Sequence, residues 1–545
     1  MMPCALAAVA TLPTGSLPSI DLMTRIEKTP SRSFTPLICL HLRNLLFFAL
    51  ASTAVGARAT TYFVSVSGDD SNEGTSTDTP WKTLNKVSAT AFKPGDRIFF
   101  KRGDTWTASN GGEQLTVSSS GASDQERIVY GTYGEGTKPI FDGFRLSGRG
   151  ASASGKRYVT LQDLDFRRSS QQGVDLQSCS HVSVLRVDVT SNGKGPAINA
   201  RRGGFILIDG CVVTDAKSNG IHFGGSATER IHDSTIQNCT VNGTRANDGI
   251  VIHADSSAEQ NPAGTNFLIR HNTATGCAEQ GFDITTGKNV SLEHNRSHGN
   301  RAGAITIGHQ ASDVVLRYHQ SENEPAGNTA ATLNISTQNV TVEYSTFTGS
   351  IHAKPIVNIK KHDLRKYSRD FLPENIVLQN NVFVWKSPTA GDIFRISSEN
   401  GAVEAHHLVV RNNIFCSTTG ARIMMHFMNP HRPPNYARDA MEGYSFNNNV
   451  YFSPGGVRWR VGSDTERTFA RYRADFPPSD SLESVEADPL FVDAAAGNYR
   501  LKTMSPARDR GHTSPGMLKA DSDGARIPMG SARDIGAFEI SVDER

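Results

Sequence analysis

Two segments in the middle of the chain carry residue types that could do chemistry. Residues 247–255 read Asn-Asp-Gly-Ile-Val-Ile-His-Ala-Asp, and residues 279–288 read Glu-Gln-Gly-Phe-Asp-Ile-Thr-Thr-Gly-Lys. The carboxylates of Asp248, Asp255 and Asp283 could supply oxygen ligands for Ca²⁺, which prefers such ligands in proteins. The alternative for Asp248 is an ordinary turn residue, because Asp-Gly pairs are common in turns.

Basic side chains near these segments could complete a site for proton abstraction. His253 or Lys288 could act as a base if its neighbours lower its pKa, and Arg270 or His309 could neutralise a carboxylate of a substrate. Such a set suits β-elimination on a uronate polymer, because the C5 proton lies beside a carboxylate whose charge must first be neutralised. A solvated surface position is the alternative for His253, Lys288 and His309. Arg270 is expected on a different strand from Asp283, which counts against its role.

Recurrent short apolar segments must position these residues. There are nine such segments, the first at Val159 and the last at Ile376. Successive segments begin 23 to 36 residues apart, and 23 is the commonest spacing. A base period of about 23 residues predicts one coil of a solenoid, here an all-β right-handed parallel β-helix of about ten or more coils with three short strands per coil. Leucine-rich repeats would need a leucine framework, and a propeller would need a period of about 40 residues.

Each coil also contains a strand that mostly begins after a Gly, and its alternation separates inward from outward side chains. The apolar positions are expected to face the core, and the residues between them to form an outward column of Asp175, Asn199, His222, Val251, Asp283, Thr306, Asn334, Asn358 and Arg395. A neighbouring column is expected to hold Gln177, His253, Thr285, Ser336 and Lys360. Such a face could bind a polar polymer, with Asp175, His222 and Thr285 as substrate-binding residues.

An Asn follows the apolar phrase in several coils. Asn272, Asn295, Asn381 and Asn413 share this position. Asn tolerates the left-handed conformation of a tight turn and can hydrogen-bond to its copy in the next coil. The sequence therefore predicts stacked Asn side chains along the solenoid.

A basic stretch follows one of the outward-facing strands. Residues 360–369 contain five Lys or Arg residues, one histidine and one tyrosine. Lys360 and Lys361 could grip an anionic polysaccharide, and Tyr367 could stack on a sugar ring. The remaining alternative is a solvated loop.

The first residues of the chain resemble an export signal. An apolar stretch at 45–51 follows Arg43 and precedes a small-x-small ending at 57–59, which is typical of a secretory signal peptide. Its depth in the chain suggests that translation could start at Met23. We therefore expect residues 1–59 to be removed and the protein to be secreted or periplasmic.

Charge and cysteine content narrow the classes of partner. Beyond residue 59 the chain has 51 basic and 52 acidic residues and five cysteines, without metal-binding spacing. No apolar run reaches the ~18 residues of a membrane span. We expect no nucleic-acid or membrane partner, a monomer, and cysteines that serve as small buried residues.

Motifs at both ends resemble secreted pectate-lyase-like β-helix proteins. The stretches 62–75, 80–84, 93–96 and 101–104 resemble the N-terminal cap of that family, and 488–493, 505–507 and 534–539 resemble its C-terminal end. The resemblance implies an N-terminal cap and first coils at 60–157, a β-helix at 158–450 and an irregular C-terminal capping region at 451–545.

Two local resemblances fall on the same coils. Residues 247–250 resemble the calcium motif of some β-helix pectate lyases, and residues 253–256 resemble a segment of mannuronan C5-epimerases. We therefore expect a lyase that cleaves a uronate polymer such as pectate or alginate. The alternatives are a C5-epimerase, a glycoside hydrolase that pairs Asp283 with Asp248 or Asp255, and a non-catalytic binding protein.

Overall fold

The structure is a computed structural model. It describes residues 58–107, 114–143, 148–225, 229–254, 264–322, 331–349, 354–361, 373–398, 405–427, 443–462, 465–476 and 483–540. The expected signal peptide lies almost entirely outside the described residues. No helix among the described residues has both the length and the apolar character needed to cross a membrane.

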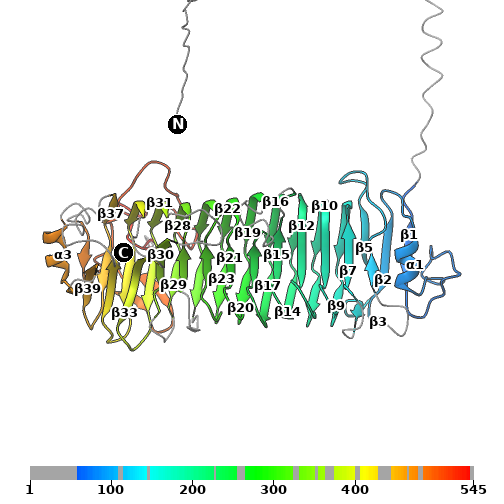
Figure 1. The fold of residues 1–545 in the computed structure, drawn as a ribbon, viewed down its shortest axis with the longest axis horizontal. Coiled ribbons are helices and arrows are strands. Elements are labelled where there is room, and N and C mark those ends of the chain that lie inside the picture. The colour runs from blue at the N-terminus through cyan, green and yellow to red at the C-terminus, as the bar shows by residue number, and fades with distance from the viewer. Residues whose placement is uncertain are drawn as a thin grey trace, which may run out of the picture. The chain divides into compact units, whose positions relative to one another are not determined.

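The described chain winds into a parallel β-helix with three strands per coil (Figure 1). One coil consists of β18 (Ile250–Ile252), β19 (Gly264–Arg270) and β20 (Thr273–Thr275), and the equivalent strands of the next coil are β21, β22 and β23. Each strand pairs in parallel with its copy one coil away, which makes the connections right-handed crossovers. The predicted fold class is confirmed.

The strands form three stacks that run the length of the solenoid. The first and second stacks belong to a 26-stranded sheet, and the third is a 14-stranded sheet. The first stack contains β4 (Leu115–Thr116), β7 (Ala151–Ser154), β10 (Val174–Leu185), β12 (Ile198–Gly204), β15 (Ile221–Gly224), β18, β21 (Phe282–Ile284), β24 (Ile305–Ile307), β27 (Leu333–Ile335), β30 (Val357–Lys361), β33 (Gly391–Ser398), β36 (Ile423–Phe427) and β39 (Val457–Val461).

The second stack begins at the N-terminal end of the described chain, and the last part of β10 also belongs to it. Its other strands are β1 (Thr61–Val64), β2 (Arg97–Lys101), β5 (Ile128–Tyr133), β8 (Arg157–Gln162), β13 (Leu207–Asp209), β16 (Ile231–Gln237), β19, β22 (Gly287–Glu293), β25 (Ser312–Arg317), β28 (Gln338–Glu343), β31 (Glu374–Gln379), β34 (His406–Arg411) and β37 (Tyr444–Asn447).

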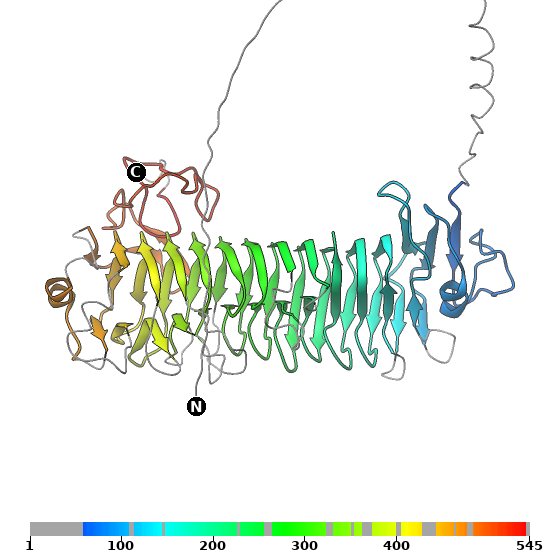
Figure 2. The same ribbon diagram turned by 45° about the horizontal axis from the view of Figure 1, so that its top comes forward.

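The third stack has mostly short strands. They are β3 (Thr105–Thr107), β6 (Ile140–Asp142), β9 (Asp165–Arg167), β11 (Asp188–Thr190), β14 (Val212–Ala216), β17 (Thr240–Thr244), β20, β23 (Arg296–His298), β26 (Gln320–Glu322), β29 (Thr346–Thr348), β32 (Val382–Trp385), β35 (Ile414–Ser417), β38 (Val450–Phe452) and β40 (Val485–Glu486). Figure 2 shows the repeated coils from a tilted view.

The inward side chains of all three stacks form one continuous apolar column. Ile250, Ile252, Phe282 and Ile284 are fully buried, as the alternation in these strands predicted. On the third stack, successive aromatic rings stack 4.9 to 5.7 Å apart along the axis, at Phe347, Phe383, Phe415 and Tyr451. The five described cysteines are buried and free, as expected.

The predicted Asn ladder is present, with one difference in conformation. Asn272 Nδ2 donates to Asn295 Oδ1 at 3.1 Å, and Asn381, Asn413 and Asn449 are linked in the same way. The left-handed residue is the one before each ladder Asn, for example His271 with φ 54°. The ladder Asn points inward and is fully buried because its amide satisfies backbone groups of neighbouring coils.

Different elements cover the two ends of the solenoid. Helix α1 (Leu84–Ala89), whose N-cap is Thr83, buries Leu84 and Val87 at the N-terminal end. Helix α3 (Phe469–Asp475) stacks Tyr472 on Trp459 of the last first-stack strand, with ring centroids 5.7 Å apart. These aromatic and aliphatic side chains shield core that an open end would expose.

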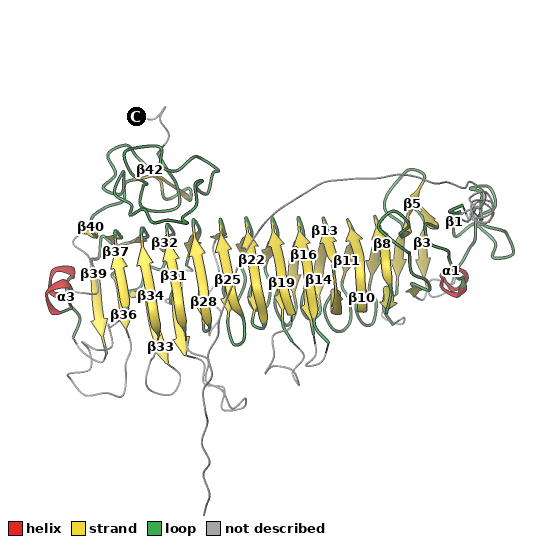
Figure 3. Cartoon of the chain, turned by 90° about the horizontal axis from the view of Figure 1, so that it is seen from above, coloured by secondary structure: helices red, strands yellow, loops and turns green. Residues whose placement is uncertain are grey.

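The last part of the chain lies on the side of the solenoid rather than at its end (Figure 3). It contains the antiparallel pair β41 (Phe491–Asp493) and β42 (Asn498–Leu501). Its apolar side chains form a separate core with outward residues of β32, β35 and β38, such as Val382, Ile414 and Val450. Within the expected capping region 451–545, therefore, α3 lies at the end and 491–540 covers part of the third stack.

Candidate functional site

The register of the first stack aligns the predicted outward column. Asp175, Asn199, His222, Val251, Asp283, Thr306, Asn334, Asn358 and Arg395 are directly paired from coil to coil. The same register adds Ser152 before Asp175 and His426 and Arg460 after Arg395, which the sequence analysis missed. The alternation inside β36 and β39 could have identified the last two.

Three acidic residues from two adjacent coils come together beside this column. We call Asp248, Glu279 and Asp283 the acidic cluster. Asp248 lies in the turn before β18, where its Oδ1 accepts a hydrogen bond from the backbone N–H of Gln280 at 2.8 Å. Asp283 lies in the middle of β21, one coil later, between Val251 and Thr306. Glu279, which the sequence analysis did not single out, lies in the turn that leads into β21.

Burial raises the pKa of all three carboxyl groups, and repulsion by like charge adds to the rise at Asp248 and Asp283. Burial is the main cause that raises the pKa of Asp248 to about 7. The hydrogen bond from Gln280 lowers this pKa, and the charge of Glu279 raises it further. Burial, then the charges of Asp248 and Glu279, raise the pKa of Asp283 well above its usual range. Burial also raises the pKa of Glu279. The acidic cluster therefore holds at least one proton near neutral pH.

Several buried oxygen atoms beside Asp283 have no hydrogen-bond partner. Among the described residues, Asp283 Oδ1, Thr285 Oγ1 and Thr306 Oγ1 are buried and unpaired. Thr306 is the direct neighbour of Asp283 on β24, and Thr285 lies two residues after Asp283. Unpaired buried polar atoms cost free energy, so their concentration here points to a partner that binds at this place.

His222 is held between two oxygen atoms on the same face. Its Nδ1 lies 2.8 Å from Asn199 Oδ1, and its Nε2 lies 3.0 Å from the carbonyl oxygen of His253. Burial lowers the pKa of His222 to about 4. The hydrogen bond to the carbonyl oxygen of His253 has the opposite, smaller effect on this pKa. His222 is therefore neutral at pH 7, with both ring nitrogens engaged by the protein.

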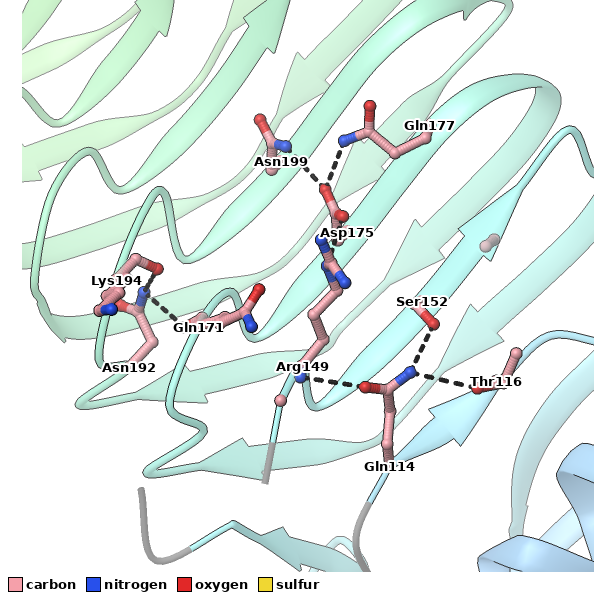
Figure 4. A network of polar contacts seen from close by, with 12 residues as sticks. Gln114, Thr116, Arg149, Ser152, Gln171, Asp175, Gln177, Asn192, Lys194 and Asn199 are labelled. Atoms are coloured by element: carbon pink, nitrogen blue, oxygen red, sulfur yellow. Dashed lines mark hydrogen bonds and ion pairs between the residues drawn. The ribbon is translucent and has the colours of Figure 1, made fainter. Parts of the chain in front are cut away.

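Asp175 is also engaged by the protein (Figure 4). Its Oδ2 lies 2.6 Å from Arg149 Nε, and its Oδ1 accepts hydrogen bonds from Gln177 and Asn199, each at 2.7 Å. The Arg149 backbone N–H donates to Gln114 Oε1 at 3.2 Å, which ties the pair to the preceding coil. Substrate binding by Asp175 and His222 stays a prediction, but both side chains already have protein partners.

The structure places the other predicted site residues at different distances from the acidic cluster. His253 directly follows β18 and, like Thr285, lies in the column next to Asp283, while Lys360 lies next to the Asn358 position on β30. His309 lies in a left-handed turn after β24, with φ 50°.

Two predicted residues belong to the second stack, as the sequence indicated for Arg270. Lys288 is exposed on β22, with Nζ 3.9 Å from Asp313 Oδ2. Arg270 ends β19, and its Nε donates to Gln237 Oε1 at 2.9 Å. Both lie off the column because the chain turns a corner between the two stacks.

Part of the expected site cannot be placed. Asp255 and Tyr367 lie outside the described residues, and so does the side chain of Lys361. No group of three or more His, Cys, Asp or Glu side chains converges as around a metal within the described ranges. Ca²⁺ binding therefore stays a prediction: Asp283 Oδ1 suits a cation, but Asp248 Oδ1 already accepts a hydrogen bond and the third expected ligand is Asp255.

Comparison with known proteins agrees with the fold. Residues 62–313 match the family model described as Pel9A-like, right handed beta helix region. Fold and match together define the class as right-handed parallel β-helix proteins. More particularly, the match to the Pel9A-like model lies in residues 62–313, so the predicted resemblance to pectate-lyase-like β-helix proteins is confirmed.

Individual relatives are distant. The lacto-N-biosidase of Bifidobacterium longum subsp. longum is 24% identical over 251 residues, a match that covers 43% of this chain and only 15% of that relative. The solved GH136 lacto-N-biosidase from Eubacterium ramulus is 15% identical, with a TM-score of 0.45 and coverage of 75% of this chain and 68% of that one. A mannuronic acid specific polysaccharide family 6 lyase from human gut microbiota is 15% identical, with a TM-score of 0.49 and coverage of 72% and 87%. These likenesses show the fold alone.

The acidic cluster should make stability depend on pH. The pKa of Asp248 rises from 3.8 to about 7 on folding, so the folded protein binds more protons than the unfolded chain between these values. This contribution to stability is fully present below about pH 4 and is lost as the pH rises through about 7. We expect Asp248→Asn, which keeps the acceptor for Gln280, to gain on the order of a few kcal/mol relative to the unsubstituted protein between pH 4 and 8. Melting temperatures of both proteins across this range test it, and parallel curves would contradict it.

Proposed function

We propose that this protein cleaves a glycosidic bond in a carbohydrate polymer by hydrolysis, with the acidic cluster as its acid–base centre. The observation that carries the proposal is the pair of buried carboxyl groups, Asp248 and Asp283, whose pKa values are raised together on adjacent coils. Glycoside hydrolases use two carboxyl groups in this manner. One donates a proton to the leaving oxygen, and the other, ionised, either activates water or attacks the sugar.

The environment of the pair suits acid–base work. The pKa of Asp248 is raised to about 7 and that of Asp283 well above its usual range, so the two groups can share a proton, with one acting as general acid while the other is ionised. Asp283 lies in the outward column with an unpaired Oδ1, next to the unpaired hydroxyls of Thr285 and Thr306. A sugar bound there could donate hydroxyl hydrogens to Asp283 and accept hydrogen bonds from the two threonines. The glycosidase name of the curated relative, lacto-N-biosidase, supports this reaction class.

Lyase action on a uronate polymer is the second candidate, and a specific observation favours it. Arg395 and Lys360 lie on the same face of the first stack, where they could attract an anionic chain. A protonated carboxyl group at Asp248 or Asp283 could donate a hydrogen bond to the uronate carboxylate. Ca²⁺ held in part by Asp255 would instead neutralise the charge of that carboxylate. His253 would then be the base, because it lies beside Thr285 on this face.

The type of product distinguishes the two reactions. Purified protein would be incubated with pectate, alginate and neutral oligosaccharides containing N-acetylhexosamine, with and without EDTA. Hydrolysis releases reducing ends without ultraviolet absorbance, whereas β-elimination creates a C4–C5 double bond that absorbs. We expect reducing ends alone. An absorbing product would replace hydrolysis with the lyase reaction, and its loss in EDTA would assign Ca²⁺ to the site.

A further inference from the structure

A cavity lies on a different face of the solenoid from the acidic cluster, although β23, which borders it, belongs to the same coil as Asp283. It has a volume of about 400 Å³ and is bordered by the third stack on one side and by the segment around β42 on the other. This size lies within the ~300–1,000 Å³ range of small-molecule sites. The solenoid contributes residues of β23, β26 and β29 together with Lys386, which follows β32.

The lining includes hydroxyl groups that have no partner. Thr346 and Tyr499 both line the cavity and are 7% and 4% exposed. Within the described residues, Thr346 Oγ1 and Tyr499 Oη are buried and form no hydrogen bond. A hydroxylated ligand in the cavity could supply the missing partners through small side-chain rotations, because hydroxyl groups both donate and accept.

The charge around the cavity is positive. Arg296 and Lys386 line it, and neither side chain has a hydrogen bond or ion pair within the described part of the chain. Arg500 also lines it but is already held by both oxygens of Asp523, at 2.7 and 2.8 Å. Glu322 is the one acidic side chain among the lining residues that are described, so two free cations face one carboxylate.

We propose that this cavity binds an acidic monosaccharide unit, whose carboxylate or sulfate pairs with Arg296 and Lys386. The sugar hydroxyls would meet the polar side chains of β26 and β29 and the hydroxyl of Tyr499. Because the cavity and the acidic cluster share no residue, the proposal is independent of the reaction at the acidic cluster. An enzyme on a long polymer would gain affinity from such a second contact, since two linked sites bind one chain together.

Isothermal titration calorimetry with three sugars tests the proposal. Galacturonate and galactose 6-sulfate represent the two anionic groups, and galactose is the neutral reference. We expect at least one acidic sugar to bind at millimolar concentrations, at least about tenfold more tightly than galactose. Preference between the two acidic sugars identifies the anionic group, and either preference supports the site.

Variants locate the binding. The double variant Arg296→Gln/Lys386→Gln is expected to weaken binding of the acidic sugar at least about tenfold. Arg301→Gln is the matched control, because Arg301 is an exposed arginine that follows β23 in the same coil and does not line the cavity. Circular dichroism would verify that both variants fold. Absence of binding by either acidic sugar, or equal binding by the double variant and the control, would overturn the proposal.

Discussion

Replacing Asp283 by Asn is expected to lower kcat/KM by about a thousandfold, within the ~10²–10⁴ range of acid–base groups. The substitution keeps the shape of the side chain and its place opposite Thr306, but it removes the carboxylate that the proposed reaction needs. Initial rates of reducing-end release by the variant and the unsubstituted protein measure the loss.

A matched substitution separates this effect from a general one. Asp209→Asn makes the same chemical change on the second stack, where Asp209 accepts hydrogen bonds from Gln237 and Asn238. We expect its kcat/KM to stay within about twofold of the unsubstituted protein. Lys288→Ala is also expected to retain activity, because Lys288 lies on β22 and contacts Asp313. Full activity in Asp283→Asn would remove the acidic cluster from the mechanism.

Removing the charge of Arg149 is expected to destabilise the first coils by about 2 kcal/mol. A buried carboxylate that loses its partner costs ~3–5 kcal/mol, and the estimate is lower here because the Arg149 side chain is 37% exposed and two amides still donate to Asp175. Native-state hydrogen exchange of the amides in β7, β10 and β12 measures the change locally, which suits a solenoid whose coils contact only their neighbours. The variant is Arg149→Leu.

A double variant and a matched pair test the cause. Asp175→Asn in the Arg149→Leu protein removes the uncompensated charge and should restore most of the lost protection. Arg186→Leu breaks the Arg186–Asp163 pair on the second stack, where Arg186 is 54% exposed, and should cost less than ~1 kcal/mol. If both single Arg variants lose protection equally, burial of Asp175 does not govern the effect.

The period of the sequence was sufficient for the solenoid and for the direction of most side chains. A β-helix buries its core by stacking each strand on the strand one coil away, so a spacing of about 23 residues fixes which positions become neighbours. This is why the column from Asp175 to Arg395 and the Asn ladder at Asn272 and Asn295 could be predicted. Alternation along each strand then decides which side chains face the core.

Contacts that do not follow the period could not be predicted in this way. Asp175 forms an ion pair with Arg149, and His222 hydrogen-bonds to the carbonyl oxygen of His253. Both interactions depend on side chains that reach from one coil to the next. The lateral position of residues 491–540 depends on the apolar outward residues Val382, Ile414 and Val450. The alternation of the sequence does not distinguish these three from other residues of a strand. The roles of Arg270 and Lys288 stay predictions. Both residues lie on the second stack, and alternation within a strand does not show where the chain turns the corner between two stacks.

By itself, therefore, the sequence determined the coil, its inward and outward faces and the coils on which the acidic residues lie. Only the tertiary structure decided that Asp248, Glu279 and Asp283 come together, and that Arg296, Lys386 and Tyr499 line one cavity. The physical reason is that a repeat specifies neighbours through backbone pairing, which is periodic. Burial, and with it the pKa of a carboxyl group, depends on everything that packs around the side chain.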